Sequence, residues 1–227
     1  MFRTIIGVAA FAAAGAVYAQ PALPQATDGR LYELRTYYAA PGKLEALHAR
    51  FRDHTVRLME RHGVTCHGFW VPGDDEPDRV VSLVSYPSAA ARTTTWAGFA
   101  TDREWLQVKR SSERQGRLVE HIADFPLVGS LGTDKAVEAA GRRVFEVKTL
   151  KHGEPIGSGE QVGVWVPATR HAEIARVVLV ARPKVTARGQ APDASPALGF
   201  VSAIVALTET PAPRTQLLVP TDYSPLK

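Results

Sequence analysis

The sequence predicts an α+β fold, in which a ferredoxin-like β-α-β-β-α unit is followed by a degenerate, strand-rich second repeat. The unit is predicted because short segments of alternating apolar and polar residues flank longer segments with helical spacing. The repeat is predicted because three sequence patterns of the first half recur, in the same order, in the second half. An antiparallel sheet with helices on one face suits this order of elements.

The unit begins with a strand over about residues 31–38, where aromatic and aliphatic residues alternate with polar ones. This alternation places Glu33, Arg35 and Tyr37 on one face of the strand. A helix follows and ends at Gly63, because Gly is the usual left-handed helix stop. Its apolar residues recur at three- and four-residue steps and form one buried stripe: Leu44, Leu47, Phe51 and Leu58.

Two more strands and a helical segment complete the unit. The strands cover about residues 64–71 and 79–87, with an acidic, proline-containing turn between them. Helical spacing then covers 88–122, with a break near Thr101-Asp102, where either residue can cap a new helix. The stretch "DFPLVGSL" can add a last strand. The buried side of the helical segment is expected to carry Trp96, Phe99, Trp105, Val108, Val119 and Ile122.

The second half repeats three patterns of the first. "YELRT" at 32–36 returns as "FEVKT" at 145–149, "GFWVP" at 68–72 returns as "GVWVP", and each is followed by an Arg-Val-Val restart. Residues 37–67 leave room for a helix between the first two patterns, whereas residues 150–162 are rich in Gly and Pro and do not. We therefore predict a duplicate that kept its strands and lost its helices.

This duplicate is expected to cover residues 129–227, after a first unit at 30–128. Its strands would lie against the sheet of the first unit and form a pseudo-dimer inside one chain. In this second half "LGFVSAIVAL" reads as another β-segment or a short buried helix. The alternative is an unrelated β-rich insertion.

Residues 1–19 are typical of a secretory signal peptide. Arg3 supplies a positive charge, residues 5–17 are apolar but too short to span a bilayer, and the cut is expected after Ala19. The alternative is a short membrane anchor. We expect a periplasmic or secreted protein with no stable membrane insertion after cleavage, and a flexible lead-in over residues 20–29.

The amino-acid composition limits the kinds of binding partner that can be expected. The 27 basic and 23 acidic side chains are scattered along the chain and leave a net charge of +4. Without a run of basic residues, a nucleic-acid partner is not expected. Cys66 is the only cysteine, so it cannot form an internal disulfide, and a small buried residue is a more natural interpretation than a nucleophile.

Seven motifs in order resemble the NIPSNAP family: "YELRTY", "APGKLEALHARFRDHT", "HG", "GFWVP", "SYPS", "WAGFATDREW" and the terminal "PTDYSPL". The resemblance implies the dimeric α+β barrel fold, in which a homodimer is usual. In that family the "PTDYSP" segment normally follows soon after the last helix, whereas here residues 129–215 intervene. Both a homodimer and an intrachain pseudo-dimer are therefore predicted as alternatives.

The expected site is a pocket between helices and sheet that binds a small, partly apolar molecule. Candidate ligand-binding residues are Glu33, Arg35, Tyr37, His54, Trp70, Trp96 and Trp105. We expect no metal and no cofactor, since no His, Cys and carboxylate set has ligand spacing.

Other interpretations of these residues stay open. His54, near the apolar helix stripe, is the candidate catalytic base of an alternative function, that of a cofactor-independent monooxygenase-like enzyme; it could equally be a core-edge residue. Glu33 and Arg35 could form a structural ion pair, and the tryptophans could be ordinary core residues. A further alternative is a protein–protein interaction module. Whether a reaction is catalysed is left uncertain.

Overall fold

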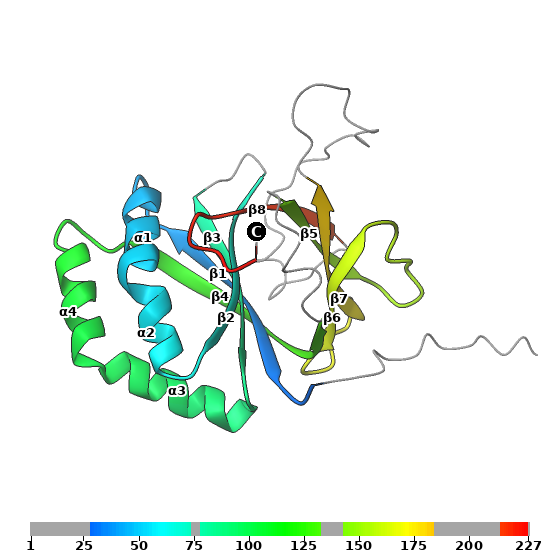
Figure 1. Cartoon of the computed structure of the whole chain (residues 1–227), viewed down its shortest axis with the longest axis horizontal. Helices are drawn as coiled ribbons and strands as arrows, with labels where there is room; N and C mark the ends of the chain where they lie inside the picture. Colours follow the sequence, from blue (N-terminus) through cyan, green and yellow to red (C-terminus); the bar gives the residue numbers. More distant parts are fainter. Residues whose placement is uncertain (1–27, 74–77, 133–142, 184–213, 227) are drawn as a thin grey trace, which may run out of the picture.

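The computed structural model describes residues 28–73, 78–132, 143–183 and 214–226. Within these residues, eight antiparallel strands close into a barrel in the order β1-β3-β2-β8-β5-β7-β6-β4 (Figure 1). The strands are β1 (Leu31–Ala39), β2 (Thr65–Pro72), β3 (Arg79–Tyr86), β4 (Val119–Leu131), β5 (Arg143–Leu150), β6 (Glu160–Pro167), β7 (Arg176–Pro183) and β8 (Arg214–Pro220). The predicted α+β class is confirmed.

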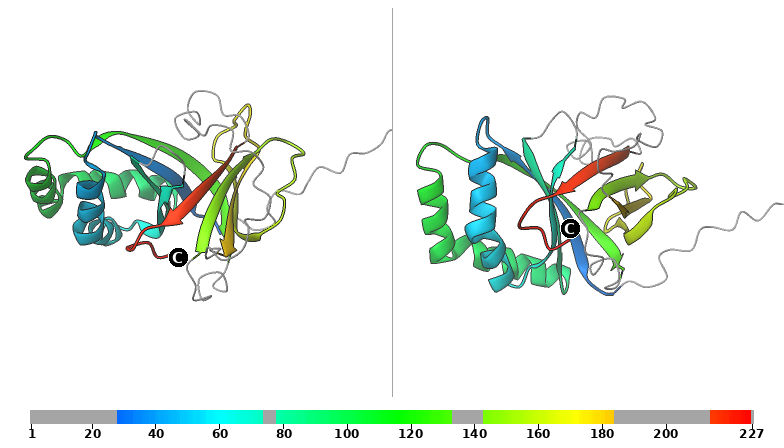
Figure 2. Two further views of the ribbon diagram at one scale, coloured as in Figure 1. Left: turned by 90° about the horizontal axis from the view of Figure 1, so that it is seen from above. Right: turned by 45° about the horizontal axis from the view of Figure 1, so that its top comes forward.

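The helices lie over the outer face of the first-half strands, at one end of the molecule (Figure 2). One continuous helical run consists of α1 (Leu44–Arg50), the π-helical turn η1 (Phe51–Thr55) and α2 (Val56–Arg61). Two helices follow β3, namely α3 (Ala89–Thr101) and α4 (Arg103–Ser112). Within the described residues, none of these helices is long and apolar enough to cross a membrane.

The predicted helix break is confirmed, but the predicted helix end is wrong. The carboxylate of Asp102 accepts a hydrogen bond from the backbone N–H of Trp105 at 2.9 Å and so caps α4. The chain leaves the helix at Ser112 and enters β4 at Val119. Ile122 therefore lies on a strand and is 43% exposed instead of buried on a helix. Apolar residues three apart fit a helix locally, but pairing with β1 decides the outcome.

Two apolar cores lie on opposite sides of the first-half strands. The barrel interior receives side chains from both halves, including Trp70 against Phe145 with ring centroids 5.6 Å apart. The second core lies beneath the helices and contains Tyr37 and Phe51. The alternation predicted for β1 is confirmed, because Tyr32 and Leu34 belong to the interior and Tyr37 to the helix side.

The two halves pair their strands alike. The order β4-β1-β3-β2 of the first half corresponds to β8-β5-β7-β6 in the second. Glu33 lies opposite Val84, and Glu146 opposite Val180. An irregularity in the pairing precedes the glycine of each Trp-containing pattern, Gly68 and Gly163. A Cβ added at either glycine would overlap the ring of the Trp two residues later, so neither position has room for a side chain.

The outer face of the second half is covered by the loop 151–159 instead of a helix. Three cationic side chains of the sheet donate hydrogen bonds to backbone carbonyls of alternate residues in this loop. The bonds join Lys148 Nζ to Ile156 O at 3.0 Å, Arg176 Nη2 to Glu154 O at 2.7 Å and Arg182 Nη2 to Ser158 O at 3.2 Å. The predicted absence of a helix here is confirmed, and side chains of the sheet satisfy three of the loop's backbone carbonyls.

The terminal "PTDYSPL" segment binds the first half. Thr221 donates its N–H to the carbonyl of Phe69 at 3.0 Å, and Ser224 Oγ accepts the N–H of Phe69 at 2.9 Å. The hydroxyl of Tyr223 lies 2.8 Å from Nδ1 of His48 on α1. The end of the chain is thus fastened to β2 and the first helix.

The predicted boundary between residues 128 and 129 falls inside β4, which continues to Leu131. Because the barrel is closed by strands of both halves, the two predicted parts share one core and are not separate structural units. The predicted signal peptide, most of the lead-in and "LGFVSAIVAL" lie outside the described residues.

Replacing Lys148 by Met is expected to lower the free energy of unfolding by about 1 kcal/mol, because the partly buried carbonyl of Ile156 loses its donor. The side chain of Lys148 is 12% exposed, whereas that of Lys151 is 50% exposed. Lys151→Met is the matched control and should change stability by less than about 0.5 kcal/mol. Urea unfolding measures both, and equal effects would contradict the loop-fastening role of Lys148.

Candidate ligand pocket

A cavity of about 480 Å³ lies between the helices and the outer face of β1 and β4. Its apolar lining is mainly aromatic: Tyr37, Phe51, Trp96, Phe99 and Trp105. Aliphatic side chains complete this lining: Met59, Val119 and Ile122. The volume and the apolar lining are those of a typical small-molecule site.

Charged side chains also line the cavity. Four are cationic and two are anionic: Arg35, Arg50, Lys109, Arg117, Glu113 and Glu120. Both anions are paired, Glu113 with Arg50 at 2.7 Å and Glu120 with Arg117 at 3.3 Å. The cavity therefore combines an aromatic lining with a cationic surplus.

The π-helical turn decides which helix residues face the cavity. The N–H of Val56 bonds to the carbonyl of Phe51, five residues back, so the turn holds one residue more than an α-helical turn. Thr55 takes the buried position after Phe51 and donates its hydroxyl to the carbonyl of Arg50 at 3.0 Å. His54 is consequently exposed and lies outside the cavity lining. Its predicted position between helix and sheet is wrong, because regular helical spacing does not continue through η1.

The floor of the cavity is a hydrogen-bonded network around the fully buried carboxylate of Glu33. Arg35 donates to Glu33 at 2.9 Å and, through Nε, to the hydroxyl of Tyr37 at 3.0 Å. Arg92 donates to Glu33 at 2.8 Å, and the Tyr86 hydroxyl donates to it at the same distance.

The network also contacts the aromatic wall, because Trp96 Nε1 donates to the Tyr86 hydroxyl at 2.9 Å. The guanidinium carbon of Arg35 lies 4.4 Å from the centroid of the Trp96 ring. The ion pair predicted for Glu33 and Arg35 exists and holds two pocket aromatics in place.

Electrostatics keep the carboxylate of Glu33 ionised. Burial raises its pKa, but the Arg35 charge and the hydrogen bonds from Arg92, Arg35 and Tyr86 outweigh burial and lower the pKa overall. Burial and the neighbouring Glu33 charge raise the pKa of Tyr86 well above its usual range. The network therefore holds its protons in place near neutral pH and acts as a rigid floor.

Arg50 is a second buried cation of the cavity, and the sequence prediction did not include it. Its Nη1 donates to Glu113 at the end of α4, and its guanidinium carbon lies 5.3 Å from the centroid of the Trp105 ring. A signal for it was available, because Arg50 lies three residues after Leu47 in the apolar stripe. A basic residue at that spacing faces the protein interior.

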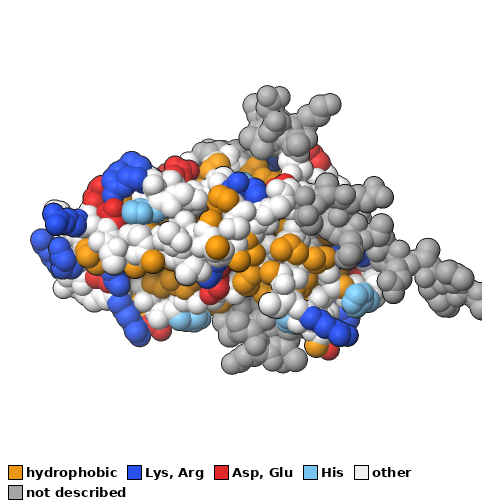
Figure 3. All heavy atoms as spheres, turned by 90° about the horizontal axis from the view of Figure 1, so that it is seen from below, with side chains coloured by type: hydrophobic (Ala, Val, Ile, Leu, Met, Phe, Trp, Pro, Cys, Tyr) orange, Lys and Arg blue, Asp and Glu red, His pale blue; other side chains and the backbone are white. Residues whose placement is uncertain are grey.

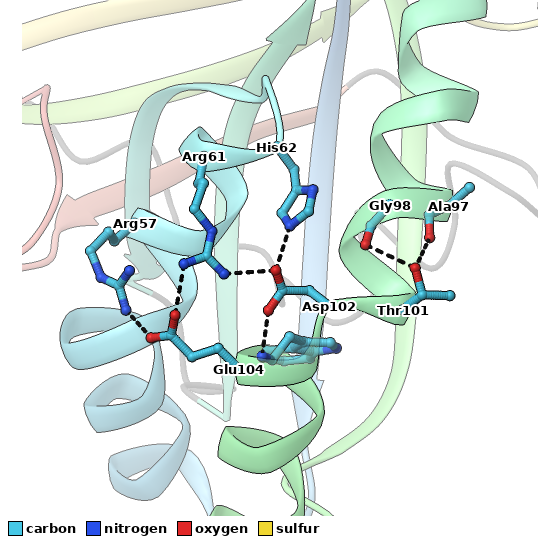
Figure 4. A network of polar contacts seen from close by, with 9 residues as sticks. Arg57, Arg61, His62, Ala97, Gly98, Thr101, Asp102 and Glu104 are labelled. Atoms are coloured by element: carbon cyan, nitrogen blue, oxygen red, sulfur yellow. Dashed lines mark hydrogen bonds and ion pairs between the residues drawn. The ribbon is translucent and has the colours of Figure 1, made fainter.

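The elbow between α3 and α4 is fastened to the end of α2 by ion pairs (Figure 4). Asp102 accepts from His62 Nε2 at 2.9 Å and from Arg61 at 2.7 Å, while Glu104 accepts from Arg57 and Arg61. The backbone hydrogen bond to Asp102, together with His62 and Arg61, lowers the pKa of its carboxyl well below the usual range. This network fixes the backbone N–H of Trp105 and hence one wall of the cavity.

Trp70, a proposed ligand-binding residue, and Cys66, considered above as a nucleophile, both lie away from the cavity. Trp70 is fully buried in the barrel interior, so its predicted place among the ligand-binding residues is wrong: alternation on β2 points it away from the helices. Cys66 is free and buried, and burial raises its pKa to about 12, which makes it a poor nucleophile. Of the predicted set, Arg35, Tyr37, Trp96 and Trp105 line the cavity, and Glu33 lies behind Arg35.

The surface seen in Figure 3 has hydrophobic side chains across its middle, whereas Lys and Arg gather at the end that carries the helices. Large hydrophobic side chains also remain exposed on β8, namely Leu217 and Val219. The interaction-module hypothesis stays a prediction.

Glu33→Gln is expected to lower the free energy of unfolding by about 3–5 kcal/mol at neutral pH, because it leaves buried Arg35 without its counter-charge. Since the folded pKa of Glu33 lies below its ordinary value of 4.5, its stabilisation is present above that pH and is lost as the pH falls through the folded pKa. The difference in the free energy of unfolding between wild type and variant should therefore disappear in acid.

Chemical unfolding at a series of pH values measures this difference. The half-exposed pair partner Glu120 provides the control, because Glu120→Gln should change stability by less than about 1 kcal/mol. A difference that widens on acidification would contradict the assignment.

Comparison with known proteins shows which proteins part of this chain resembles. Residues 32–128 match the NIPSNAP family model. Protein NipSnap homolog 3B of Mus musculus is 31% identical over 85 residues, which cover 37% of this chain and 34% of that protein. The matched region thus spans about a third of the length of that relative.

Solved structures of NIPSNAP proteins are also similar. One is a family member of unknown function from Agrobacterium tumefaciens, at 20% identity and a TM-score of 0.39, covering 44% of this chain and 86% of that one. Another is a NIPSNAP-like domain protein from Burkholderia xenovorans, at 16% identity and a TM-score of 0.41, covering 47% and 90%. The predicted resemblance is confirmed, because residues 32–128 match the NIPSNAP family model and part of the chain is similar to the mouse NipSnap relative.

Proposed function

We propose that this protein binds a small, partly apolar molecule in the cavity beneath its helices. The observation that carries the proposal is the cavity itself, about 480 Å³ with five aromatic side chains in its lining. Sites for small molecules are typically concave, mostly apolar and supplied with a few polar groups that orient the ligand. The cavity has these properties.

The walls of the cavity support binding because they are held before any ligand arrives. The Glu33 network fixes Arg35, Tyr37 and Trp96, and the Asp102 network fixes the start of α4. A site whose side chains are already ordered loses less conformational entropy on binding. This arrangement favours a binding site over a gap that collapses around its own side chains.

We further infer that residues 129–227 are a degenerate second repeat, so that one chain builds the barrel that a homodimer builds in the dimeric α+β barrel fold. The matched strand order and register support this inference. The two places where strands of different halves pair also correspond. Val71 on β2 pairs with Val219 on β8, and Val166, the counterpart of Val71 on β6, pairs with Val128 on β4. An unrelated insertion has no reason to reproduce these pairings.

The repeat inference implies one pocket of this kind for each chain among the described residues. Lys148 occupies the position that corresponds to Arg35, and the loop 151–159 lies directly over it. Leu150 stands where Tyr37 stands in the first half, and it is buried. The second half therefore completes the barrel and covers its own copy of the site.

The export of the protein remains a proposal based on the signal-like residues 1–19, which lie outside the described part of the chain. A periplasmic or secreted location would place the pocket in contact with small molecules outside the cytoplasm. The monooxygenase-like alternative also stays a hypothesis, and its proposed base His54 is exposed and does not line the cavity.

Ile122→Trp is expected to weaken binding of the neutral fluorescent probe N-phenyl-1-naphthylamine by about tenfold or more, because the larger side chain fills the cavity at β4. Energy transfer from protein tryptophans to the probe measures binding. Leu106→Trp is the matched control, since Leu106 is similarly exposed, at 38%, but does not line the cavity. Wild-type protein that fails to bind the probe, or two variants that weaken it equally, would contradict the pocket.

Native mass spectrometry of the chain without residues 1–19 is expected to show a monomer, because strands of the second half pair with both edges of the first-half sheet. A saturating apolar ligand should add one ligand mass to each chain. A homodimer as the main species would overturn the intrachain pseudo-dimer and return residues 129–227 to the status of an insertion.

A further inference from the structure

We propose that the ligand of this cavity is a small organic anion, with a carboxylate or sulfonate head group on a flat aromatic or apolar body. The head group would bind beside Arg50 and Lys109, and the body would lie against the aromatic lining. This inference rests on the proposed function, because it names the chemical class that the same cavity takes.

The guanidinium of Arg50 is incompletely satisfied although it is 7% exposed. Nη1 donates to Glu113 at 2.7 Å and approaches Ser112 Oγ at 3.5 Å. Nε is buried and has no hydrogen-bond partner among the described residues. A buried cation with unused N–H donors is costly, and the Arg50 side chain lines the cavity, so an oxygen of a bound molecule can accept a hydrogen bond from the part of the guanidinium that faces the cavity.

Lys109 places a second positive charge beside Arg50. It lies on α4 one turn before Ser112 and Glu113, the residues that Arg50 contacts, and side chains at that spacing share a helix face. No ion pair involves Lys109 among the residues that the structure describes. Its ammonium is therefore available to an anion at the cavity.

The remaining charges of the lining leave this end positive. Arg35 is already held by Glu33 and Tyr37, and Arg117 by Glu120. Glu113 faces Arg50 and balances one charge only. An anionic head group would gain charge-assisted hydrogen bonds from Arg50 and attraction from Lys109, whereas a neutral polar group would gain less.

The aromatic wall begins directly beside this cationic end. Arg50 lies over the Trp105 ring, and the Trp105 and Phe99 ring centroids are 4.6 Å apart. A flat apolar body attached to the head group would therefore contact aromatic side chains without a long linker. A compact aromatic acid fits this layout better than a molecule with its charge in the middle.

Two probes that differ only in an anionic group test the inference. 1-Anilinonaphthalene-8-sulfonate carries a sulfonate on the skeleton of N-phenyl-1-naphthylamine. Dissociation constants of both are measured by fluorescence for the wild type and for Arg50→Gln and Lys109→Gln. We expect the wild type to bind the sulfonate about tenfold or more tightly than the neutral probe, with a preference that falls as salt is added.

Arg50→Gln should weaken binding of the sulfonate by about 10- to 100-fold while changing the neutral probe by less than about threefold. Lys109→Gln should weaken the sulfonate selectively by about three- to tenfold. The control is Arg52→Gln, which removes the same charge from an exposed residue that pairs with Asp222 and does not line the cavity. It should leave the preference unchanged.

The outcomes separate the two proposals. Failure of both probes to bind the wild type contradicts the proposed function and this inference with it. Equal affinity for the two probes, or an unchanged preference in both cavity variants, overturns the anion class while the apolar pocket survives. If Arg50→Gln does not fold, Lys109→Gln decides, because its exposed side chain is not needed for packing.

Discussion

A four-stranded sheet with helices on one face has two unpaired edges and a second apolar face without cover. In this protein the edges are β2 and β4, and the second half of the chain supplies a strand to each, β8 and β6. Closure also buries the second face, because the tryptophans of the two repeated patterns enter one interior core. Every other feature of the molecule depends on this closure, since it removes the open edges that invite association with other chains.

Closure assigns different tasks to the two faces of β1. The inward face contributes Tyr32 and Leu34 to the barrel core, while the outward face carries the Glu33 carboxylate and Arg35 under the helices. A fully buried carboxylate is tolerated there because two arginines and a tyrosine hydroxyl satisfy it. The same bonds order the aromatic residues of the cavity. One network therefore both satisfies the buried charge and fixes the binding surface.

The two halves differ in what lies over the sheet. In the first half, helices stand away from β1 and leave a cavity of about 480 Å³. In the second half, a loop lies close to the sheet, and Lys148, Arg176 and Arg182 satisfy its carbonyls. A cavity needs rigid walls that do not collapse, and helices fastened by ion pairs such as those of Asp102 provide them.

The sequence by itself determined the α+β class, strands β1, β2 and β3, the capped break at Asp102, the missing helix after β5 and the family resemblance, because these depend on local periodicity and on short motifs. The position of four of the seven proposed ligand-binding residues at the cavity was also predictable, since alternation and helical spacing set their faces. Only the tertiary structure decided that His54 is exposed, that Trp70 belongs to the barrel core and that residues 119–122 belong to a strand and not to a helix. Those outcomes depend on one extra residue in a helical turn and on strand pairing between distant segments, and neither leaves a periodic signal in the chain.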